Sequence, residues 1–190
     1  YMEIGQLDNA VKFYEKVLAL NPNHTDAQYN LAITFEALGQ LDDAVKSYEK
    51  VLALKPEHFA SYNNLGVLFN ELGNQESAVT SYKKAITIKP DFADAYNNLG
   101  VSLSELGNQE DAVTSYKKAI TIKPDFAEAC NNLGNILKDL GQLDAAVRSY
   151  KKAITIKLDF ADAHNNLGIT LKELGQLDFA VKNFEKALII

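Results

Sequence analysis

Apolar and polar positions alternate along this chain in a pattern that repeats every 34 residues. Residues 66–99 and 100–133 are identical at 28 of 34 positions, a self-similarity that chance does not produce. A fixed period of this length is typical of architectures in which one small structural unit is stacked many times. We number the positions of the repeat from 1 to 34, with Ala93 as position 1.

The first half of each repeat predicts an amphipathic helix. At about 100° per residue, Leu99 and Leu103 fall on one side of such a helix, and Asp94 and Asn98 fall on the opposite side. Gly107 follows the last apolar position, where glycine can adopt the left-handed conformation that ends a helix. The first helix is therefore predicted to end at position 15.

The second half of the repeat predicts another amphipathic helix. Ala112 and Tyr116 lie on its apolar face, and its other face is rich in lysine, threonine and acidic residues. Lys123 then precedes Pro124, and a residue before proline is disfavoured in the helical conformation. Each repeat is thus predicted to be a pair of helices joined by a tight turn, and the whole chain to be all-α.

The numbering treats residues 1–190 as a single array. The units are a partial repeat at 1–24, full repeats at 25–58, 59–92, 93–126 and 127–160, and a shortened repeat at 161–190. Because Tyr1 falls at position 11, we expect residues 7–20 to form a second helix without a complete partner, and the chain to be a fragment of a longer array. All 10 glycines occupy position 8 or 15 and all 4 prolines occupy position 32, which leaves none for an irregular linker.

Composition narrows the classes of partner and compartment. The net charge of −6 argues against nucleic acid as the main partner, since phosphate binding requires a basic face. No apolar run approaches the ~20 residues that a membrane helix needs. The only cysteine, Cys130, cannot form an internal disulfide, so nothing indicates an oxidising compartment. We therefore expect a cytoplasmic protein that does not bind membranes.

The spacing resembles that of the tetratricopeptide repeat (TPR) family over the entire chain. Position 20 is alanine in all six copies: Ala10, Ala44, Ala78, Ala112, Ala146 and Ala180. Position 24 is aromatic in all six: Tyr14, Tyr48, Tyr82, Tyr116, Tyr150 and Phe184. The resemblance implies an α-solenoid, a right-handed superhelix of antiparallel helix pairs whose first helices line the concave surface. Leu158 departs from the pattern, since proline is expected there, and we expect that junction to be less rigid.

The strongest functional signal is one asparagine per complete repeat at position 6. These residues are Asn30, Asn64, Asn98, Asn132 and Asn166. An asparagine amide both donates and accepts, so a regular series of them suits the backbone of an extended peptide. Two alternatives remain open: the asparagines brace neighbouring helices, or recent duplication has preserved them without a use.

The motif NNLG resembles the TPR arm of O-linked N-acetylglucosamine transferase. That resemblance implies that the asparagines at position 6 hold a peptide by its backbone, and that acidic residues at position 2 contact threonine side chains. Here the acidic residues are Asp26, Asp94, Glu128 and Asp162. We include the asparagines at position 5 in the candidate site: Asn63, Asn97, Asn131 and Asn165. A transferase domain is absent from the sequence, so the likeness covers only the recognition arm.

Other chemistry is weakly indicated. The TPR proteins that bind a C-terminal carboxylate use lysine or arginine at positions 2, 5 and 6, and this chain has none there. His24, His58 and His164 are too widely spaced to predict a metal site. Cys130 occupies a packing position and is expected to be a small buried hydrophobe. We therefore expect no catalytic site, metal or cofactor.

The leading hypothesis is a non-enzymatic scaffold for protein–protein interaction that holds an extended peptide or flexible segment in its groove. One alternative is the substrate-recognition arm of a larger enzyme, such as a glycosyltransferase, and another is a purely structural array. We expect a basic or neutral partner, because positions 2, 12 and 13 carry nine acidic side chains and two lysines. We also expect end-to-end association through residues 7–20 and 188–190, which lack covering repeats.

Overall fold

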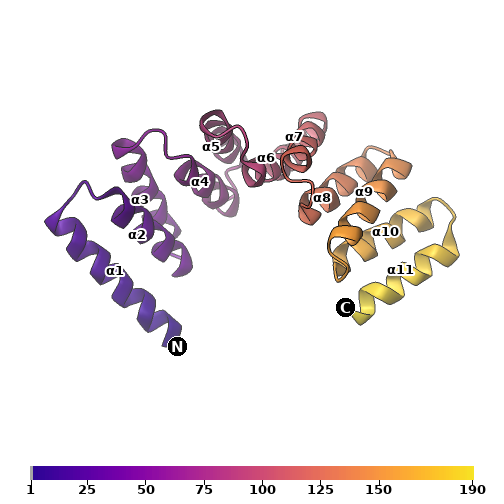
Figure 1. Cartoon of the computed structure of the whole chain (residues 1–190), viewed down its shortest axis with the longest axis horizontal. Helices are drawn as coiled ribbons and strands as arrows, with labels where there is room; N and C mark the ends of the chain where they lie inside the picture. Colours follow the sequence, from indigo (N-terminus) through magenta and orange to yellow (C-terminus); the bar gives the residue numbers. More distant parts are fainter. Residues whose placement is uncertain (1) are drawn as a thin grey trace. The chain divides into compact units, whose positions relative to one another are not determined.

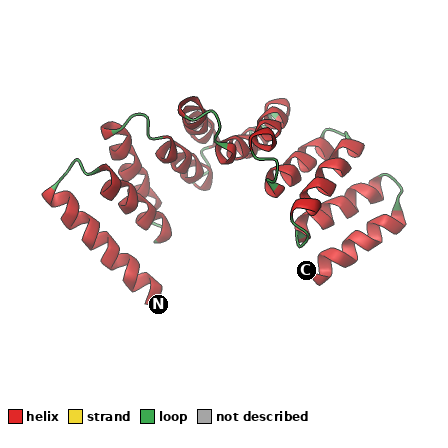
Figure 2. Ribbon diagram, viewed as in Figure 1, coloured by secondary structure: helices red, strands yellow, loops and turns green. Residues whose placement is uncertain are grey.

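The computed structural model describes the backbone of residues 2–190 and the side chains of residues 5–190. Over this part of the chain there are eleven helices and no strands (Figures 1 and 2). The helices are α1 (Met2–Leu20), α2 (Thr25–Ala37), α3 (Leu41–Leu54), α4 (Phe59–Glu71), α5 (Gln75–Ile88), α6 (Ala93–Glu105), α7 (Gln109–Ile122), α8 (Ala127–Asp139), α9 (Leu143–Ile156), α10 (Ala161–Glu173) and α11 (Leu177–Ile189). The predicted all-α solenoid of paired helices is confirmed. None of the described helices is both long and apolar enough to cross a bilayer.

The chain divides into two compact units, and the division falls between Pro90 and Asp91, close to a predicted repeat border. In the first unit, α2 pairs with α3 and α4 pairs with α5, and α1 packs on α2 (Figure 1). In the second unit the pairs are α6 with α7, α8 with α9 and α10 with α11. Within each unit, the second helix of one pair packs against the first helix of the next: α3 on α4 in the first unit, and α7 on α8 and α9 on α10 in the second.

The turn between the two helices of a pair has the predicted left-handed glycine. Gly107 has φ +77°, and its N–H donates to the Ser104 carbonyl at 3.0 Å. The N–H of Asn108 donates to the Leu103 carbonyl at 2.8 Å, which completes the hydrogen-bond pattern of a Schellman motif. Five glycines at position 15 share the positive φ: Gly39, Gly73, Gly107, Gly141 and Gly175.

Gly5 departs from this prediction. It also occupies position 15, but it lies inside α1 and is not among the residues with positive φ. The three described residues that precede it belong to the same helix as the residues that follow it. The helix instead continues through residues 2–6, and α1 is longer than the predicted 7–20.

The glycine at position 8 allows the aromatic ring at position 24 to pack against the backbone of the first helix. A Cβ added at Gly100 would lie 2.6 Å from Tyr116 Cε1, and one added at Gly66 would lie 2.5 Å from Tyr82 Cε1. Real Cβ atoms do not approach ring carbons so closely. The absence of a side chain at position 8 therefore allows the two helices of a pair to approach each other to this distance. The rings of Tyr82 and Tyr150, which face Gly66 and Gly134, are essentially inaccessible to solvent.

Candidate functional site

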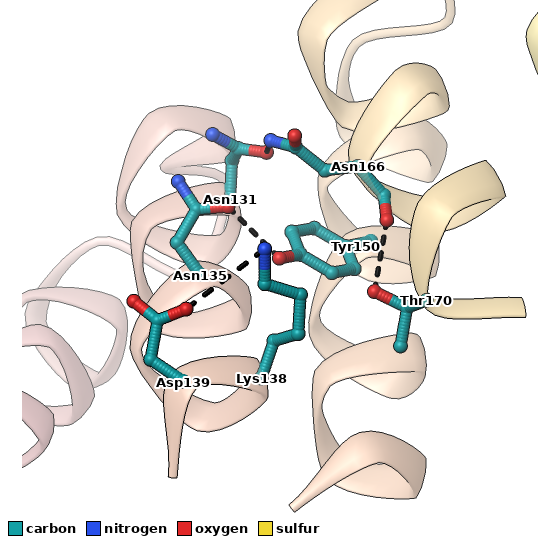
Figure 3. Close-up of polar contacts among 7 residues, drawn as sticks. All are labelled: Asn131, Asn135, Lys138, Asp139, Tyr150, Asn166 and Thr170. Carbon is teal, nitrogen blue, oxygen red and sulfur yellow. Dashed lines mark hydrogen bonds and ion pairs between the residues drawn. The ribbon is translucent and has the colours of Figure 1, made fainter. Parts of the chain in front are cut away.

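The asparagines at position 6 connect the first helices of successive repeats in the second unit. Asn132 Nδ2 on α8 donates to Asn97 Oδ1 on α6 at 3.1 Å. Asn166 Nδ2 on α10 donates to Asn131 Oδ1 on α8, also at 3.1 Å (Figure 3). Asn97 Nδ2 lies 3.4 Å from Asn98 Oδ1, so position 5 is connected to position 6 of the same helix as well. The structure therefore brings the two predicted asparagine positions together, and position 6 braces the neighbouring helix.

The contacts between helices use the Nδ2 donors of Asn132 and Asn166 and leave their Oδ1 acceptors unused. Among the described residues, nothing donates a hydrogen bond to the side-chain oxygen of Asn132 or Asn166. Both residues are half-buried, so part of each side chain is open to solvent. An acceptor at each of these two positions is consequently available to a donor outside the chain, such as a peptide N–H.

In the first unit, position 6 has different partners. Asn64 Nδ2 donates to the Tyr48 hydroxyl at 2.9 Å and lies 3.4 Å from the Tyr29 hydroxyl. Asn63 Nδ2 lies 3.4 Å from Asn64 Oδ1. Asn30 is exposed, and no described side chain hydrogen-bonds its amide. The five asparagines are thus equivalent in sequence but not in their contacts.

The tyrosine hydroxyls at position 24 belong to the same polar face, which sequence reasoning did not predict. Tyr48 donates to the Glu36 carboxylate, and Tyr150 donates to Asn135 Oδ1 at 2.8 Å (Figure 3). Tyr116 forms no hydrogen bond with a described residue. The signal for these hydroxyls was available, since five of six copies carry tyrosine at a position where phenylalanine would fill the same space.

Burial perturbs the ionisation of several of these groups. Desolvation raises the pKa of Glu36, the hydrogen bond from Tyr48 opposes that rise, and the nearby charge of Glu71 adds to it. Desolvation also raises the pKa of Tyr116, and the charge of Glu105 adds to this increase. The carboxylates at positions 12 and 13 therefore lie close enough to the tyrosines to affect them electrostatically.

A small pocket of about 220 Å³ opens on this face of the second unit. It lies between α6 and α8, with one residue contributed by α7. Its lining includes the predicted site residue Asn132, the acidic residues Glu105 and Asp139, and Tyr116. Because residues with carboxylate, amide and phenol side chains line the pocket, it offers several hydrogen-bond acceptors to a cationic group.

The acidic residues at position 2 lie apart from this pocket. Asp26, Asp94, Glu128 and Asp162 are exposed, and each occupies the first turn of its helix. A carboxylate there interacts favourably with the helix dipole, which gives these residues a structural purpose without any ligand. Asn165, at position 5 of α10, is also exposed and has no described side-chain partner.

The histidines and the cysteine have structural positions. His24 and His58 cap α2 and α4, because their Nδ1 atoms accept hydrogen bonds from Ala27 N and Ser61 N, each at 3.2 Å. His164 is buried, with its Nδ1 3.0 Å from Asn183 Oδ1. Cys130 is buried, and desolvation raises the pKa of its thiol. A raised thiol pKa disfavours the reactive thiolate.

Comparisons with known proteins agree with this geometry. Residues 67–107, 102–141 and 134–175 match a family model described as TPR repeat, and residues 1–68 match one described as tetratricopeptide repeat. Among solved structures, MamA is 30% identical with a TM-score of 0.78, and the alignment covers 83% of this chain and 92% of MamA. A comparison with curated protein sequences gave no match.

Two more distant structures share the fold. YrrB, described as a TPR protein with an unusual peptide-binding site, is 22% identical with a TM-score of 0.75, and the alignment covers 92% of this chain and 90% of YrrB. PilF of Pseudomonas aeruginosa is 20% identical with a TM-score of 0.83, and the alignment covers 96% of this chain and 83% of PilF. At these identities the likeness extends to the fold alone.

Proposed function

Because the chain belongs to the tetratricopeptide repeat family, we propose that it is a non-enzymatic scaffold that holds an extended peptide or flexible protein segment. The segment would lie along the polar face of the first helices. The observation that carries this proposal is the pair of unused acceptors on Asn132 and Asn166, which recur at the same position of successive repeats. Each hydrogen bond from a peptide N–H would contribute roughly 0.5–1.5 kcal/mol net.

The charge of this face favours a basic or neutral partner. In the second unit, positions 2, 12 and 13 carry six acidic side chains and two lysines: Asp94, Glu105, Glu128, Asp139, Asp162 and Glu173, with Lys138 and Lys172. These eight residues account for a net charge of −4, whereas the whole chain has −6. Such a local excess attracts cations, and the attraction weakens as salt screens it.

Two further points support the same reading. YrrB, which has the same fold, is described as having a peptide-binding site. No feature of the described residues favours the alternative in which the chain is the recognition arm of an enzyme. The cytoplasmic location inferred from the single cysteine remains part of this proposal.

A peptide array can test the proposal if bracing is separated from binding. The double variant N132A/N166A removes both the bracing donors and the unused acceptors. The comparison variant N97A/N131A breaks the same two hydrogen bonds, together with the contact from Asn97 to Asn98, but leaves Asn132 and Asn166 in place. Asn97 and Asn131 are buried, so their own side chains are closed to a peptide. We expect both to lose similar stability, and only N132A/N166A to weaken many unrelated peptides alike, by ~1–3 kcal/mol.

The array also tests the acidic residues at position 2. Changing Asp94 and Glu128 to alanine should alter which peptides are selected while the backbone contacts persist. If N132A/N166A bound the same peptides as the wild type with undiminished affinity, the asparagines would be purely structural. The proposed function would then fail.

A further inference from the structure

We propose that the pocket between α6 and α8 binds a lysine side chain of the captured segment. This inference rests on the proposed function and adds the chemistry that selects the partner. The pocket measures about 220 Å³, below the ~300–1,000 Å³ typical of small-molecule sites. Its size therefore suits one side chain and not a whole small-molecule ligand.

Tyr116 is the residue that distinguishes this pocket from a merely acidic surface. Its side chain is only 3% exposed and its ring packs against Gly100, yet its hydroxyl forms no hydrogen bond with a described residue. In the next repeat, the equivalent Tyr150 hydroxyl donates to Asn135. The residue matching Asn135 in the repeat of Tyr116 is Val101, which cannot accept a hydrogen bond. The hydroxyl of Tyr116 is thus left for an external partner.

The pocket offers the surroundings that an aminoalkyl chain requires. Val101 and Ile136 provide apolar walls for the methylene groups. Glu105 and Asp139 line the same pocket, and Asn132 contributes an unused amide oxygen. An ammonium group has three donors and no acceptor, so phenol, amide and carboxylate oxygens arranged around it can all accept from it.

The charge balance leaves room for an added cation. Lys138 Nζ lies 3.8 Å from Asp139 Oδ1, so that carboxylate is already partly compensated. Glu105 has no ion pair with a described residue, so its charge remains uncompensated. One lysine side chain of the partner would neutralise the charge of Glu105.

Lysine fits this arrangement better than arginine does. A guanidinium group has a planar fork of donors that matches two oxygens of a single carboxylate or phosphate. Here the acceptors come from three helices and from different chemical groups, which suits a compact ammonium whose three donors diverge. The limited volume of the pocket also favours the compact ammonium group of lysine over the larger guanidinium group of arginine.

Titration with short peptides tests the proposal. The probes are acetylated and amidated pentapeptides, Ala-Ala-X-Ala-Ala, in which X is lysine, arginine or norleucine. The protein carries labelled isoleucine methyl groups, and the Ile136 signal is assigned from the variant I136V. We expect the lysine peptide to shift the Ile136 signal, and the norleucine peptide, which keeps the alkyl chain without the charge, to shift it at least tenfold less at equal concentration.

Variants separate the pocket from general charge effects. Y116F removes only the hydroxyl and should weaken the lysine peptide about tenfold, as expected for a hydrogen bond to a charged group. E105Q/D139N should abolish the shift. D125N/D159N removes the same charge from exposed turns and should preserve most of the shift. Thermal unfolding of each variant establishes that it is folded.

The outcomes distinguish this inference from the proposed function. Equal responses to lysine, arginine and norleucine, or an unaffected Y116F, would overturn the lysine pocket. If the array nevertheless showed asparagine-dependent peptide binding, the proposed function would stand without it. An absence of binding in both experiments would overturn both.

Discussion

The tyrosine at position 24 contributes to each repeat through both its ring and its hydroxyl. The ring packs against the glycine at position 8, so this pair determines how closely the two helices of a repeat approach. The hydroxyl extends to the polar face, where it contacts Glu36 in one repeat and Asn135 in another. A single residue therefore connects the packing of the repeat to the chemistry of its binding face.

The close approach of ring and backbone leads to a prediction for glycine substitutions. In G100A the new Cβ would lie 2.6 Å from Tyr116 Cε1, so we expect a loss of about 1–3 kcal/mol from overpacking. In G5A nothing lies within 4 Å of the new Cβ, and the better helix former should stabilise α1 by roughly 0.5–1 kcal/mol. Urea unfolding of the two variants measures both effects. Equal stabilities would show that the ring at position 24 relaxes freely.

Glu36 predicts a specific dependence of stability on pH. Burial raises its pKa in the folded state, so the folded protein holds this proton more tightly than the unfolded chain does. The resulting stabilisation is fully present below the ordinary carboxyl pKa of 4.5 and is lost as the pH rises through the folded-state pKa. The stability of wild type relative to E36Q should therefore be greater at pH 4 than at pH 7.

Urea midpoints at both pH values provide the measurement for Glu36. The glutamine of E36Q keeps an oxygen that can accept the hydrogen bond from Tyr48 but does not titrate. E49Q, on an exposed helix face, serves as the control for the change in net charge. Parallel pH profiles for wild type and E36Q would contradict the prediction.

At the scale of helices, the ends of the elements follow from a few local residues. The glycine at position 15 ends the first helix, and the lysine at position 31 ends the second in an extended conformation, with φ −125° and ψ 90° at Lys123. Lys157 has nearly the same geometry, φ −128° and ψ 98°, although Leu158 replaces the following proline. The backbone of that junction is thus already compatible with proline.

We expect L158P to stabilise the chain by ~0.4–1 kcal/mol, because proline reduces the entropy of the unfolded chain. The substitution removes no hydrogen bond found between described backbone groups, since Leu158 N is not a donor in the turn after α9. Leu158 is also 78% exposed, so little packing is lost. A fall in the urea midpoint would indicate that the last junction needs a conformation that proline cannot adopt.

Helix pairs were predictable from sequence because their signals are local, and contacts across repeats were not. The period of apolar residues, Gly107 and Pro124 define the helices without knowledge of their neighbours. The hydrogen bond of Asn132, by contrast, is made with Asn97, which lies 35 residues earlier. Whether it forms depends on how α6 and α8 are rotated about their own axes. Tyr116 was not predicted to be a polar site residue, because packing of its ring was enough to account for an aromatic residue at position 24. The prediction was wrong for Gly5, because a glycine at position 15 can also continue a helix, as it does in α1.

At the scale of the whole molecule, apolar side chains remain uncovered on the terminal helices. Leu188 and Ile189 at the end of α11 are 86% and 84% exposed, and Phe13 on α1 is 61% exposed. Within the two units, the second helices α3, α7 and α9 instead pack on the first helix that follows each of them. Apolar surface of this kind gains ~25 cal/mol per Å² when it is removed from water.

We therefore expect the chain to associate with itself as its concentration rises, through contacts of α11 with α1 of another copy. Such a contact joins two different surfaces, so it need not close on itself and should yield species larger than a dimer.

Sedimentation velocity over a range of protein concentrations measures the size of the species formed. L188K/I189K should remain monomeric, because two charged side chains would have to be desolvated in the contact. T121K/T155K adds the same charge to exposed positions of α7 and α9 and should associate as the wild type does. A wild-type chain that stays monomeric at the highest concentration would contradict this, and would mean that the gain from covering these side chains does not exceed the entropy lost on association.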